Sequence, residues 1–338
     1  MNQDKKVSQA YDIIGDIHGH AAELEALLHK LGYSEEEGCF RHPEGRKVVF
    51  LGDYIDRGPE IRRVLQIVRA MIDAGEAQGI LGNHEVNALW YHHQDKDGQY
   101  LRAHGPGIKK QHIASLEQIA RPQPNEWKAW LDWMAGLPLW LDFGVFRVVH
   151  ACWAAENIQA LEGIDLRNFD DLVKYSRKGS KENQLLRPLL NGPELELPEG
   201  VVFMAHGGKK CEEIRYKWWE PLEGLSYRRA LYPGHDPGLP DMLIENPPSS
   251  NSVAPEDPIM FFGHYAILEE KPAPILPNLA CLDYGCGKGG DLVAYRWDGE
   301  SFLNDSNFVS VSPREASRNG SIEIDRYSSE PNLEGGIE

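Results

Sequence analysis

The stretch YDIIGDIHG at residues 11–19 decides the fold class that we expect for this chain. Its first four residues form a mostly apolar run typical of a buried strand, and residues 21–31 carry leucines at helical spacing. The loop between them places Asp16 and His18, flanked by glycines, at the end of the strand. A strand, a polar loop and a helix in this order predict one unit of an α/β sheet.

The same unit occurs again in the first third of the sequence. Residues 47–51 and 78–81 form apolar runs, and a helical pattern over residues 60–72 follows the first of them. The loops after these runs read GDYIDRG at residues 52–58 and GNHE at residues 82–85. The carboxyl ends of parallel strands share one edge of a sheet. We therefore expect the polar side chains of the three loops to converge there: Asp16, His18, Asp53 and Asn83.

Two later histidines are expected at the same edge. His150 ends the apolar run of residues 145–149, and His264 follows the run of residues 259–262. His206, which precedes two glycines after another apolar run, remains an alternative to His150. Carboxylate, imidazole and amide oxygen together suit a divalent ion such as Mn, Fe or Zn. Asp53 is the central candidate for a carboxylate that bridges two such ions.

The composition indicates a globular protein with an acidic balance of charge. The chain has 338 residues, of which 41% are apolar, enough for one large domain or two ordinary ones. Its 35 basic and 52 acidic residues give a net charge of −17, which argues against nucleic acid or an anionic membrane as the main partner. The sequence shows neither the ~20 apolar residues of a bilayer span nor the apolar core of a secretory signal. Five scattered cysteines favour reduced thiols and a cytoplasmic location.

We expect a single domain over residues 1–303. A helical insertion is predicted at about residues 85–140, and its histidines are expected on a solvated helix face: His92, His93, His104 and His112. Residues 176–258, rich in Pro, Gly and charge, are expected to form long ordered loops with short elements. Apolar runs at residues 259–262, 279–282 and 292–297 predict further strands, and residues 304–338 are expected to form a polar C-terminal tail.

The motifs GDxHG, GDxxDRG and GNHE, followed by two single histidines, resemble those of the calcineurin-like metallophosphoesterase superfamily, in particular its protein-phosphatase-like branch. The resemblance covers roughly residues 11–297. It implies a four-layer α/β sandwich, with two mixed β-sheets packed face to face, helices outside, and the metal site at the carboxyl ends of the strands.

The resemblance also implies a role for each motif residue. Two divalent ions (Mn, Fe or Zn) would generate a bridging hydroxide that attacks phosphorus directly. The first ion would be held by Asp16, His18 and Asp53, with His264 placed beside this cluster, and the second by Asp53, Asn83 and His150. The catalytic set would be His84 as general acid, Asp56 as the group that orients it, and Arg57 as a phosphate clamp.

The sequence departs from the pattern of the protein phosphatases at two places. Leu81 stands where these enzymes usually carry Arg before GNHE, and Ala151-Cys152 follows His150 in place of two glycines. A second phosphate-binding residue therefore stays open among Arg102, Arg187 and Arg215. In the other direction, Asp56 favours the protein-phosphatase-like branch, because bacterial diadenosine-polyphosphate hydrolases usually carry Ala at that position.

These residues lead to an expected activity with two alternatives. We expect a metal-dependent hydrolase of phosphomonoesters, which would act on a phosphorylated protein (at Ser, Thr or Tyr) or on small aryl phosphates. The first alternative is a nucleotide hydrolase that acts on diadenosine polyphosphates or cyclic nucleotides; few basic residues for a polyanion are obvious in the sequence. The second is a metal-binding interaction module without activity, which the complete motif set disfavours.

Overall fold

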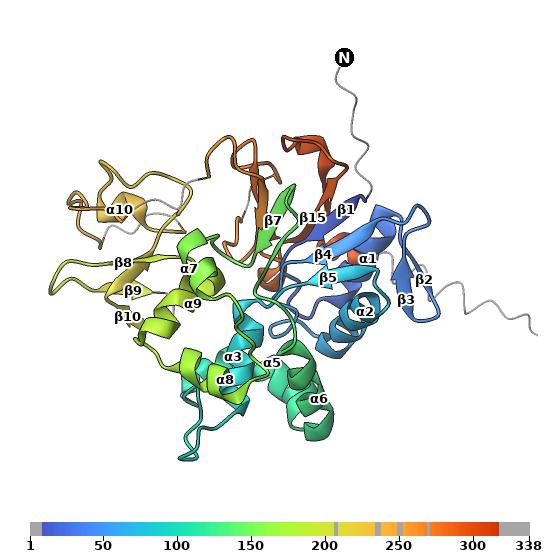
Figure 1. The fold of residues 1–338 in the computed structure, drawn as a ribbon, viewed down its shortest axis with the longest axis horizontal. Helices are drawn as coiled ribbons and strands as arrows, with labels where there is room; N and C mark the ends of the chain where they lie inside the picture. The colour runs from blue at the N-terminus through green and yellow to red at the C-terminus, as the bar shows by residue number, and fades with distance from the viewer. Residues whose placement is uncertain (1–8, 206–208, 234–237, 249–252, 269–270, 318–338) are drawn as a thin grey trace, which may run out of the picture.

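The structure is a computed structural model that describes residues 9–205, 209–233, 238–248, 253–268 and 271–317. Two mixed β-sheets lie face to face at its centre, and helices cover them (Figure 1). The expected α/β fold class is therefore confirmed. Within the described residues, no helix combines the length and the apolar composition needed to cross a bilayer.

The larger sheet has six strands and carries the three motif loops. Its strands are β1 (Tyr11–Ile14), β4 (Lys47–Phe50), β5 (Ala77–Gly79), β14 (Asp283–Tyr284), β15 (Asp291–Trp297) and β16 (Phe308–Val311). β1 pairs in parallel with β4, and β4 pairs in parallel with β5. β15 runs antiparallel to β1, β14 and β16. The carboxyl ends of β1, β4 and β5 therefore lie along one edge of this sheet.

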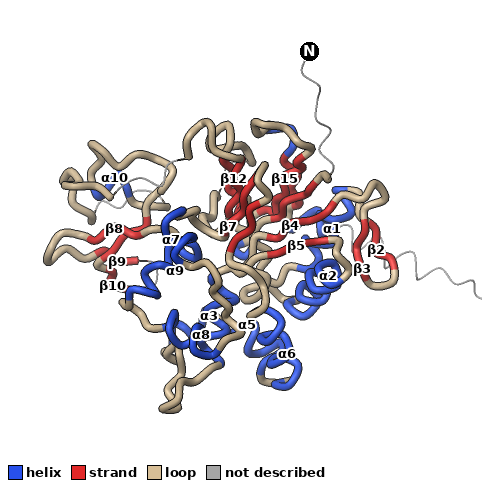
Figure 2. Tube along the Cα trace, in the orientation of Figure 1, coloured by secondary structure: helices blue, strands red, loops and turns tan. Residues whose placement is uncertain are grey.

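The second sheet has four strands and carries both late histidines. Its strands are β6 (Trp140–Asp142), β7 (Phe146–Val149), β12 (Ile259–Phe262) and β13 (Leu279–Cys281). β7 and β13 both run parallel to β12, and β6 is antiparallel to β7. Three small two-stranded sheets lie outside the main layers (Figure 2): β2 (Ser34–Glu36) with β3 (Cys39–Arg41), β8 (Glu194–Glu196) with β11 (Glu213–Arg215), and β9 (Phe203–Ala205) with β10 (Lys209–Cys211).

Alternate residues of the strands face opposite hydrophobic cores, as the two-residue period of a strand requires. Ile13 and Val49 of the larger sheet meet Val148 and Phe261 of the second sheet in the core between the layers. Ile14, one residue away from Ile13, belongs to the core beneath the helices. Burying each such side chain stabilises the fold by about 1.5–3 kcal/mol.

The helices and turns of the structure have the following bounds. They are α1 (Ala21–Leu31), α2 (Ile61–Asp73), α3 (Asn83–His92), α4 (Pro106–Gln111), α5 (Ile113–Ser115), the π-helix η1 (Leu116–Ala120), α6 (Pro124–Met134), α7 (Ala155–Ala160), α8 (Phe169–Ser176), α9 (Lys181–Asn191), α10 (Tyr227–Ala230), and the 3-10 turns η2 (Cys286–Lys288) and η3 (Asp305–Asn307). Residues 83–134 are thus mostly helical, and α3 begins directly at the GNHE motif.

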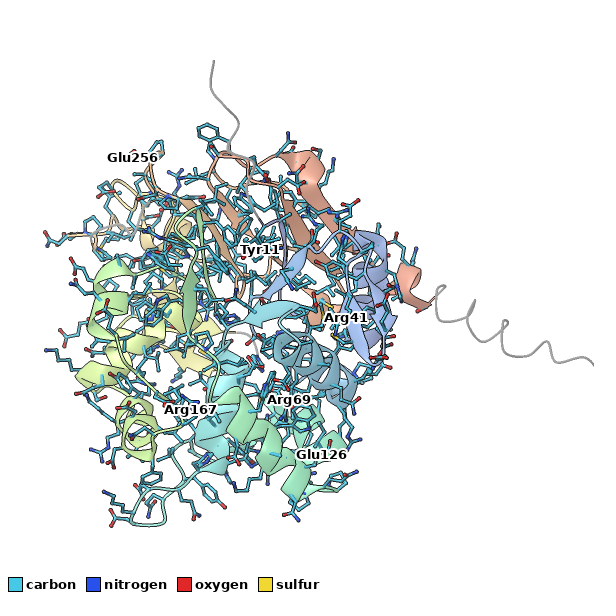
Figure 3. The ribbon with its side chains drawn as sticks, turned by 45° about the vertical axis from the view of Figure 1, so that its right-hand side comes forward. Tyr11, Arg41, Arg69, Glu126, Arg167 and Glu256 are labelled. Carbon is cyan, nitrogen blue, oxygen red and sulfur yellow. The ribbon has the colours of Figure 1, made fainter. Side chains whose placement is uncertain are left out.

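The helices of residues 106–134 are fastened to the body of the protein by α2. Arg62 donates to Glu126 at 2.8 Å, and the guanidinium of Arg69 lies 5.6 Å from the ring centre of Trp130. Figure 3 shows Arg69 and Glu126 on these neighbouring helices. The insertion therefore lies next to the sheet edge that carries the motifs.

The structure differs from the sequence expectations in two regions. Residues 181–191 form α9 although they were expected in a loop-rich region; this helix contains Pro188 and buries Leu186, Leu189 and Leu190. Within the expected polar tail, β16 pairs with β15, because alternate residues of FVSV suit the edge of a sheet. Residues 318–338 of that tail lie outside the described residues.

Candidate metal centre and active site

The site is built on loops with an uncommon backbone conformation. Among the described residues, five of the seven non-glycine residues with positive φ lie in these loops: His18, Asp53, Asp56, Arg57 and His264. Such a conformation costs of order 1–3 kcal/mol per residue and persists where the surrounding structure enforces it. The fold thus maintains strain at the ends of β1, β4 and β12, where polar side chains are presented to one another.

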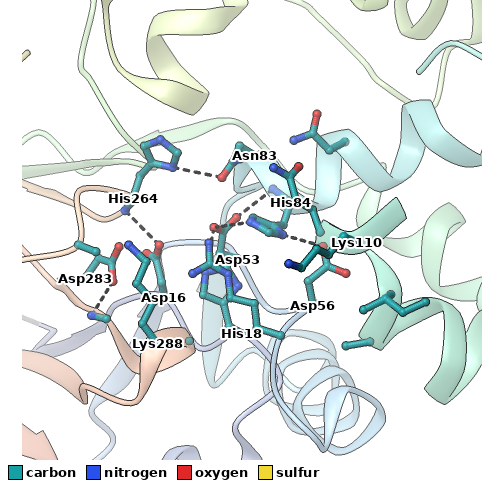
Figure 4. Close-up of a pocket in the computed structure, with 18 of the residues that line it drawn as sticks. Asp16, His18, Asp53, Asp56, Asn83, His84, Lys110, His264, Asp283 and Lys288 are labelled. Carbon is teal, nitrogen blue, oxygen red and sulfur yellow. Dashed lines mark hydrogen bonds and ion pairs between the residues drawn. The ribbon is translucent and has the colours of Figure 1, made fainter. Parts of the chain in front are cut away.

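Asp53 lies at the centre of the cluster, as the sequence predicts. Its Oδ2 is 3.4 Å from His18 Nε2, and its Oδ1 is 3.4 Å from His150 Nε2. His84 Nε2 lies 4.0 Å from Oδ2, while the backbone N–H of His84 donates to Oδ1 at 3.0 Å (Figure 4). Oδ2 therefore faces two imidazoles from loops of the larger sheet, and Oδ1 faces the imidazole of His150 from the second sheet.

Backbone carbonyls fix the orientation of two of these imidazoles. His18 Nδ1 lies 3.0 Å from the carbonyl of Ile55, and His150 Nδ1 lies 2.9 Å from the carbonyl of Leu51. A carbonyl oxygen only accepts, so Nδ1 carries the proton in both rings. In the neutral rings, each Nε2 then presents a lone pair to Asp53. This arrangement is typical of metal-ligating histidines.

Asn83 and His264 extend the same collection of acceptors. Asn83 Oδ1 is 3.1 Å from His150 Nε2 and 3.2 Å from His264 Nδ1. The backbone N–H of His264 donates to Asp16 Oδ2 at 3.0 Å. Asp16 Oδ1 and His264 Nε2 are buried, and neither has a hydrogen-bond partner among the described residues. Buried polar atoms without a partner, such as these two, fit the ligands of divalent cations better than they fit a closed hydrogen-bond network.

The geometry forms two groups of three possible ligands that share one residue. His18, Asp53 and His84 form one group, and Asp53, His150 and His264 form the other, with ligand atoms within 4.8 Å of one another in each. The ring of His264 therefore joins His150, whereas the sequence analysis places it beside the first cluster. His206, the alternative to His150, lies outside the described residues.

Burial and neighbouring charges set the ionisation of the central groups. Burial opposes the charge of Asp53, but the imidazoles of His150, His84 and His18 outweigh it and lower the pKa of Asp53 to about 2. Burial lowers the pKa of His18 to about 3. Burial, followed by the charges of Asp283 and Asp53, raises the pKa of Asp16 well above its usual value. A neutral imidazole beside ionised Asp53 is the state that binds a metal ion.

Asp56 and His84 form a close pair next to this centre. Asp56 Oδ2 is 2.6 Å from His84 Nδ1, so His84 presents Nε2 toward the centre. Burial lowers the pKa of His84, but the charges of Asp53 and Asp56 and the hydrogen bond to Asp56 outweigh it and raise that pKa. Arg57 lines the same pocket. The sequence predicts all three residues here, and the structure brings them together.

Glu85 is a site residue whose role the sequence analysis misses. Its carboxylate accepts the backbone N–H groups of Asp53 at 2.8 Å, Tyr54 at 2.9 Å and Ile55 at 3.3 Å, together with that of Gly82 at 2.9 Å. It is fully buried. The signal was present, because Glu at the third position of a helix that starts after Gly82 is a capping residue. Glu85 thus joins two of the loops that carry the possible ligands.

A pocket of about 410 Å³ opens over the cluster, and its lining combines the carboxylates of the cluster with cationic side chains around them. The described residues that line it include five cationic side chains: Arg57, Arg102, Lys110, Arg215 and Lys288. Lys110 and Lys288 lie on opposite sides of Asp53 in Figure 4.

Arg187, the third arginine that the sequence left open for phosphate binding, lies outside this pocket lining and pairs with Glu194 and Glu213. Two carboxylates that the sequence did not single out, Asp283 and Glu85, flank the cluster, and only Asp283 lines the pocket.

The fold and the ligand set together define a metal-dependent phosphoesterase. Residues 11–297 match the family model described as calcineurin-like phosphoesterase, and the chain belongs to this family. Family membership implies divalent metal ions.

Two curated relatives are named bis(5'-nucleosyl)-tetraphosphatase [asymmetrical]. The one from Geobacillus thermodenitrificans is 51% identical over 73 residues, which are 22% of this chain and 30% of the relative. The one from Bacillus subtilis is 32% identical over 174 residues, which are 50% of this chain and 62% of the relative. The matched part therefore spans less than two thirds of the length of either relative.

A solved structure with a similar arrangement is the cold-active protein-tyrosine phosphatase of a psychrophilic Shewanella species. It is 17% identical, with a TM-score of 0.45, and the match covers 90% of this chain and 80% of that one. A likeness at this level carries no argument about the substrate.

Proposed function

We propose that this protein hydrolyses the polyphosphate chain of a nucleotide, such as a dinucleoside tetraphosphate, with the aid of two divalent metal ions. The observation that carries the proposal is the set of five basic side chains around the cluster of possible ligands. The whole chain has a net charge of −17, so these cations gather against the overall balance of charge. A basic pocket attracts a polyanionic substrate. The printed names of the two curated relatives support the same substrate class.

The proposed metal ligands are the six residues that the sequence singles out. Asp16, His18 and Asp53 would hold one ion. Asn83, His150 and His264 would hold the other, with Asp53 shared between the two. The bound ions would supply an activated water and would neutralise charge on the phosphoryl oxygens. Oxygen and imidazole ligands of this kind accept Mn, Fe and Zn.

The remaining residues would bind the reacting phosphoryl group and supply a proton. The planar guanidinium of Arg57 would pair with two phosphoryl oxygens and stabilise the charge that grows on them. Asp56 holds the proton of His84 on Nδ1, so the protonated ring can donate its Nε2 proton to the departing oxygen while the phosphorus–oxygen bond breaks. No side chain would form a covalent bond with phosphorus.

The cations beyond Arg57 distinguish a polyphosphate from a phosphomonoester. Arg102 and Lys110 come from the insertion, Arg215 from β11 and Lys288 from η2, so they surround the pocket. A single phosphoryl group needs the metal ions and one clamp, whereas a chain of four phosphates extends to further cations. The phosphoprotein activity expected from the sequence is the competing proposal, and nothing in the pocket favours it specifically.

The direct test compares three substrates at saturating Mn²⁺. We expect kcat/KM to be highest for diadenosine tetraphosphate, lower for p-nitrophenyl phosphate and lowest for a phosphoserine peptide. Faster turnover of the peptide or of the aryl ester would overturn the nucleotide proposal and restore the phosphomonoester activity. Two bound ions without turnover of any of the three would support a binding module instead.

Substitutions of the cationic side chains that line the pocket make this test more specific. Arg102→Ala and Lys110→Ala should each raise KM for the tetraphosphate about tenfold, because each removes a cation from the path of the phosphate chain. They should leave KM for p-nitrophenyl phosphate unchanged. Arg121→Ala is the matched control, since Arg121 lies in the same insertion but pairs with Glu117 at 3.6 Å on the surface.

A further inference from the structure

Asp56 is held from both sides, and only one side is explained by the proposed chemistry. Its Oδ2 faces His84, the proposed proton donor. Its Oδ1 faces the insertion, where it lies 2.8 Å from His112 Nδ1 and accepts the hydroxyl of Ser115 at 2.5 Å. The backbone N–H of Asp56 also donates to Ser115 Oγ at 3.1 Å. The carboxylate is therefore shared between two imidazoles that come from different parts of the chain.

His112 is built into the interior of the insertion. It lies between α4 and α5 and is 3% exposed, so the expectation of a solvated helix face is wrong for this residue. Its second nitrogen, Nε2, lies 3.1 Å from His92 Nε2, and His92 is the last residue of α3. Its ring centre lies 5.8 Å from that of Trp127 and 5.2 Å from that of Tyr91. Neither nitrogen of His112 is thus left for another task.

The contacts of His112 determine what it can do for Asp56. A carboxylate with one hydrogen-bonded oxygen can rotate about its terminal bond, because this torsion has a broad minimum. Donors on Oδ1 from His112 and Ser115 restrict that rotation and keep Oδ2 directed at His84. His92 and Trp127 in turn keep the ring of His112 in place.

We propose that His112, with Ser115, is a positioning residue of the insertion that holds Asp56 and, through it, the proton-donating orientation of His84. The proposal rests on the function of His84 as general acid. It gives the insertion a second task beyond supplying Arg102 and Lys110 to the pocket. Any shift of the insertion away from α2 would release Asp56 and lower the rate without removing a metal ligand.

The test uses two substitutions of His112 in the full chain. His112→Phe keeps a ring in the aromatic surroundings but removes the donor to Asp56, and we expect kcat to fall about tenfold with KM and metal content unchanged. His112→Asn keeps an amide N–H near the position of Nδ1, so it should recover most of the loss. His104→Phe is the matched control, because His104 lies in the same insertion and stacks on Tyr91 at 3.9 Å without touching Asp56.

A double-mutant cycle separates positioning from general structural damage. If His112 acts only through His84, adding His112→Phe to His84→Asn should lower kcat no further. Independent, multiplicative losses would overturn the proposal, as would a His112→Phe variant with unchanged kcat. If His84→Asn itself retains full kcat, the function proposed for His84 fails as well. Thermal unfolding of all variants identifies one that is merely unstable, and Ser115→Ala, with an expected loss of the same kind, then replaces it.

Discussion

The carboxylate of Glu85 accepts the backbone N–H of Asp53 at 2.8 Å, and Asp53 is the member that the two groups of possible metal ligands share. The same carboxylate accepts N–H groups from the GNHE loop and from two further residues of the GDYIDRG loop. One buried side chain therefore fixes the distance between two loops that follow different strands. Its loss should affect folding and metal binding together.

Glu85→Ala should destabilise the protein by about 3 kcal/mol or more, because it leaves four backbone N–H groups buried without their acceptor. The free energy of unfolding in urea measures this effect. Glu117→Ala is the control, since Glu117 is exposed and pairs on the surface with Arg121. A loss below about 1 kcal/mol for Glu85→Ala would show that water replaces the carboxylate.

Asp53→Asn and His84→Asn should separate metal binding from proton donation. Asp53→Asn removes the charge shared by the two groups of ligands, so both metal content and activity should fall. His84→Asn should retain the metal ions, because the proposed set of six ligands does not include His84, and kcat should fall about 10²-fold because the proton donor is lost. Elemental analysis and steady-state kinetics on the same preparations measure both quantities. Equal metal content in the wild type and Asp53→Asn would contradict the shared position of Asp53. Asp132→Asn serves as the control, because the side chain of Asp132 is exposed and pairs with Lys128 on the surface.

The convergence of the possible metal ligands has a physical reason that the sequence shows. Each of these residues lies in the loop just after an apolar run, and such runs become strands whose ends meet at one edge. His150 could be found in this way although it belongs to the other sheet, because β7 runs parallel to β12 and ends beside it. The strands that the sequence predicts in the two main sheets have bounds within one or two residues of the expected ones, since most of their residues are buried. The strands β6, β14 and β16 were not predicted.

The cationic side chains around the pocket and the contact of His112 with Asp56 could not be predicted in the same way. Arg102 and Arg215 are two of the three arginines that the sequence left open, whereas Lys110 and Lys288 were not singled out. These four residues lie far apart in the sequence, and only packing brings them to one pocket. His112 has no strand or glycine beside it, so nothing local distinguishes it from an exposed helical histidine. The helix α9 was missed because Pro188 interrupts its pattern, whereas tertiary burial of its leucines outweighs that cost.

Gly263→Ala should weaken metal binding at the edge of the second sheet. A Cβ at this position would clash with Asp16 Oδ1, which is buried and has no hydrogen-bond partner among the described residues, so Asp16 would have to move. We expect metal affinity to fall about tenfold or more. Gly107→Ala is the control, because a Cβ there meets nothing within 4 Å. Titration of the metal-free protein with Mn²⁺ measures the difference, and equal affinities would show that the Asp16 carboxylate can shift without loss.

Asp56→Asn should move the alkaline limb of the pH–rate profile to lower pH. Burial alone lowers the pKa of His84, and the charges of Asp53 and Asp56 raise it above its usual value, so the protonated donor persists to higher pH in the wild type. The rate then falls as pH rises through this pKa. The amide keeps the shape of the carboxylate but removes one charge. A hydrogen bond to a charged group contributes about 1.5–3 kcal/mol, which corresponds to a shift of about one to two pH units.

The measurement is kcat/KM against pH at a Mn²⁺ concentration that saturates both proteins throughout the range. Only the alkaline limb should move, because Asp56 does not belong to either group of possible metal ligands. His112→Asn should leave that limb in place, since it retains the donor that keeps Asp56 directed at His84. An alkaline limb that is unchanged in Asp56→Asn, or that moves to higher pH, would mean that another group supplies the proton to the leaving oxygen.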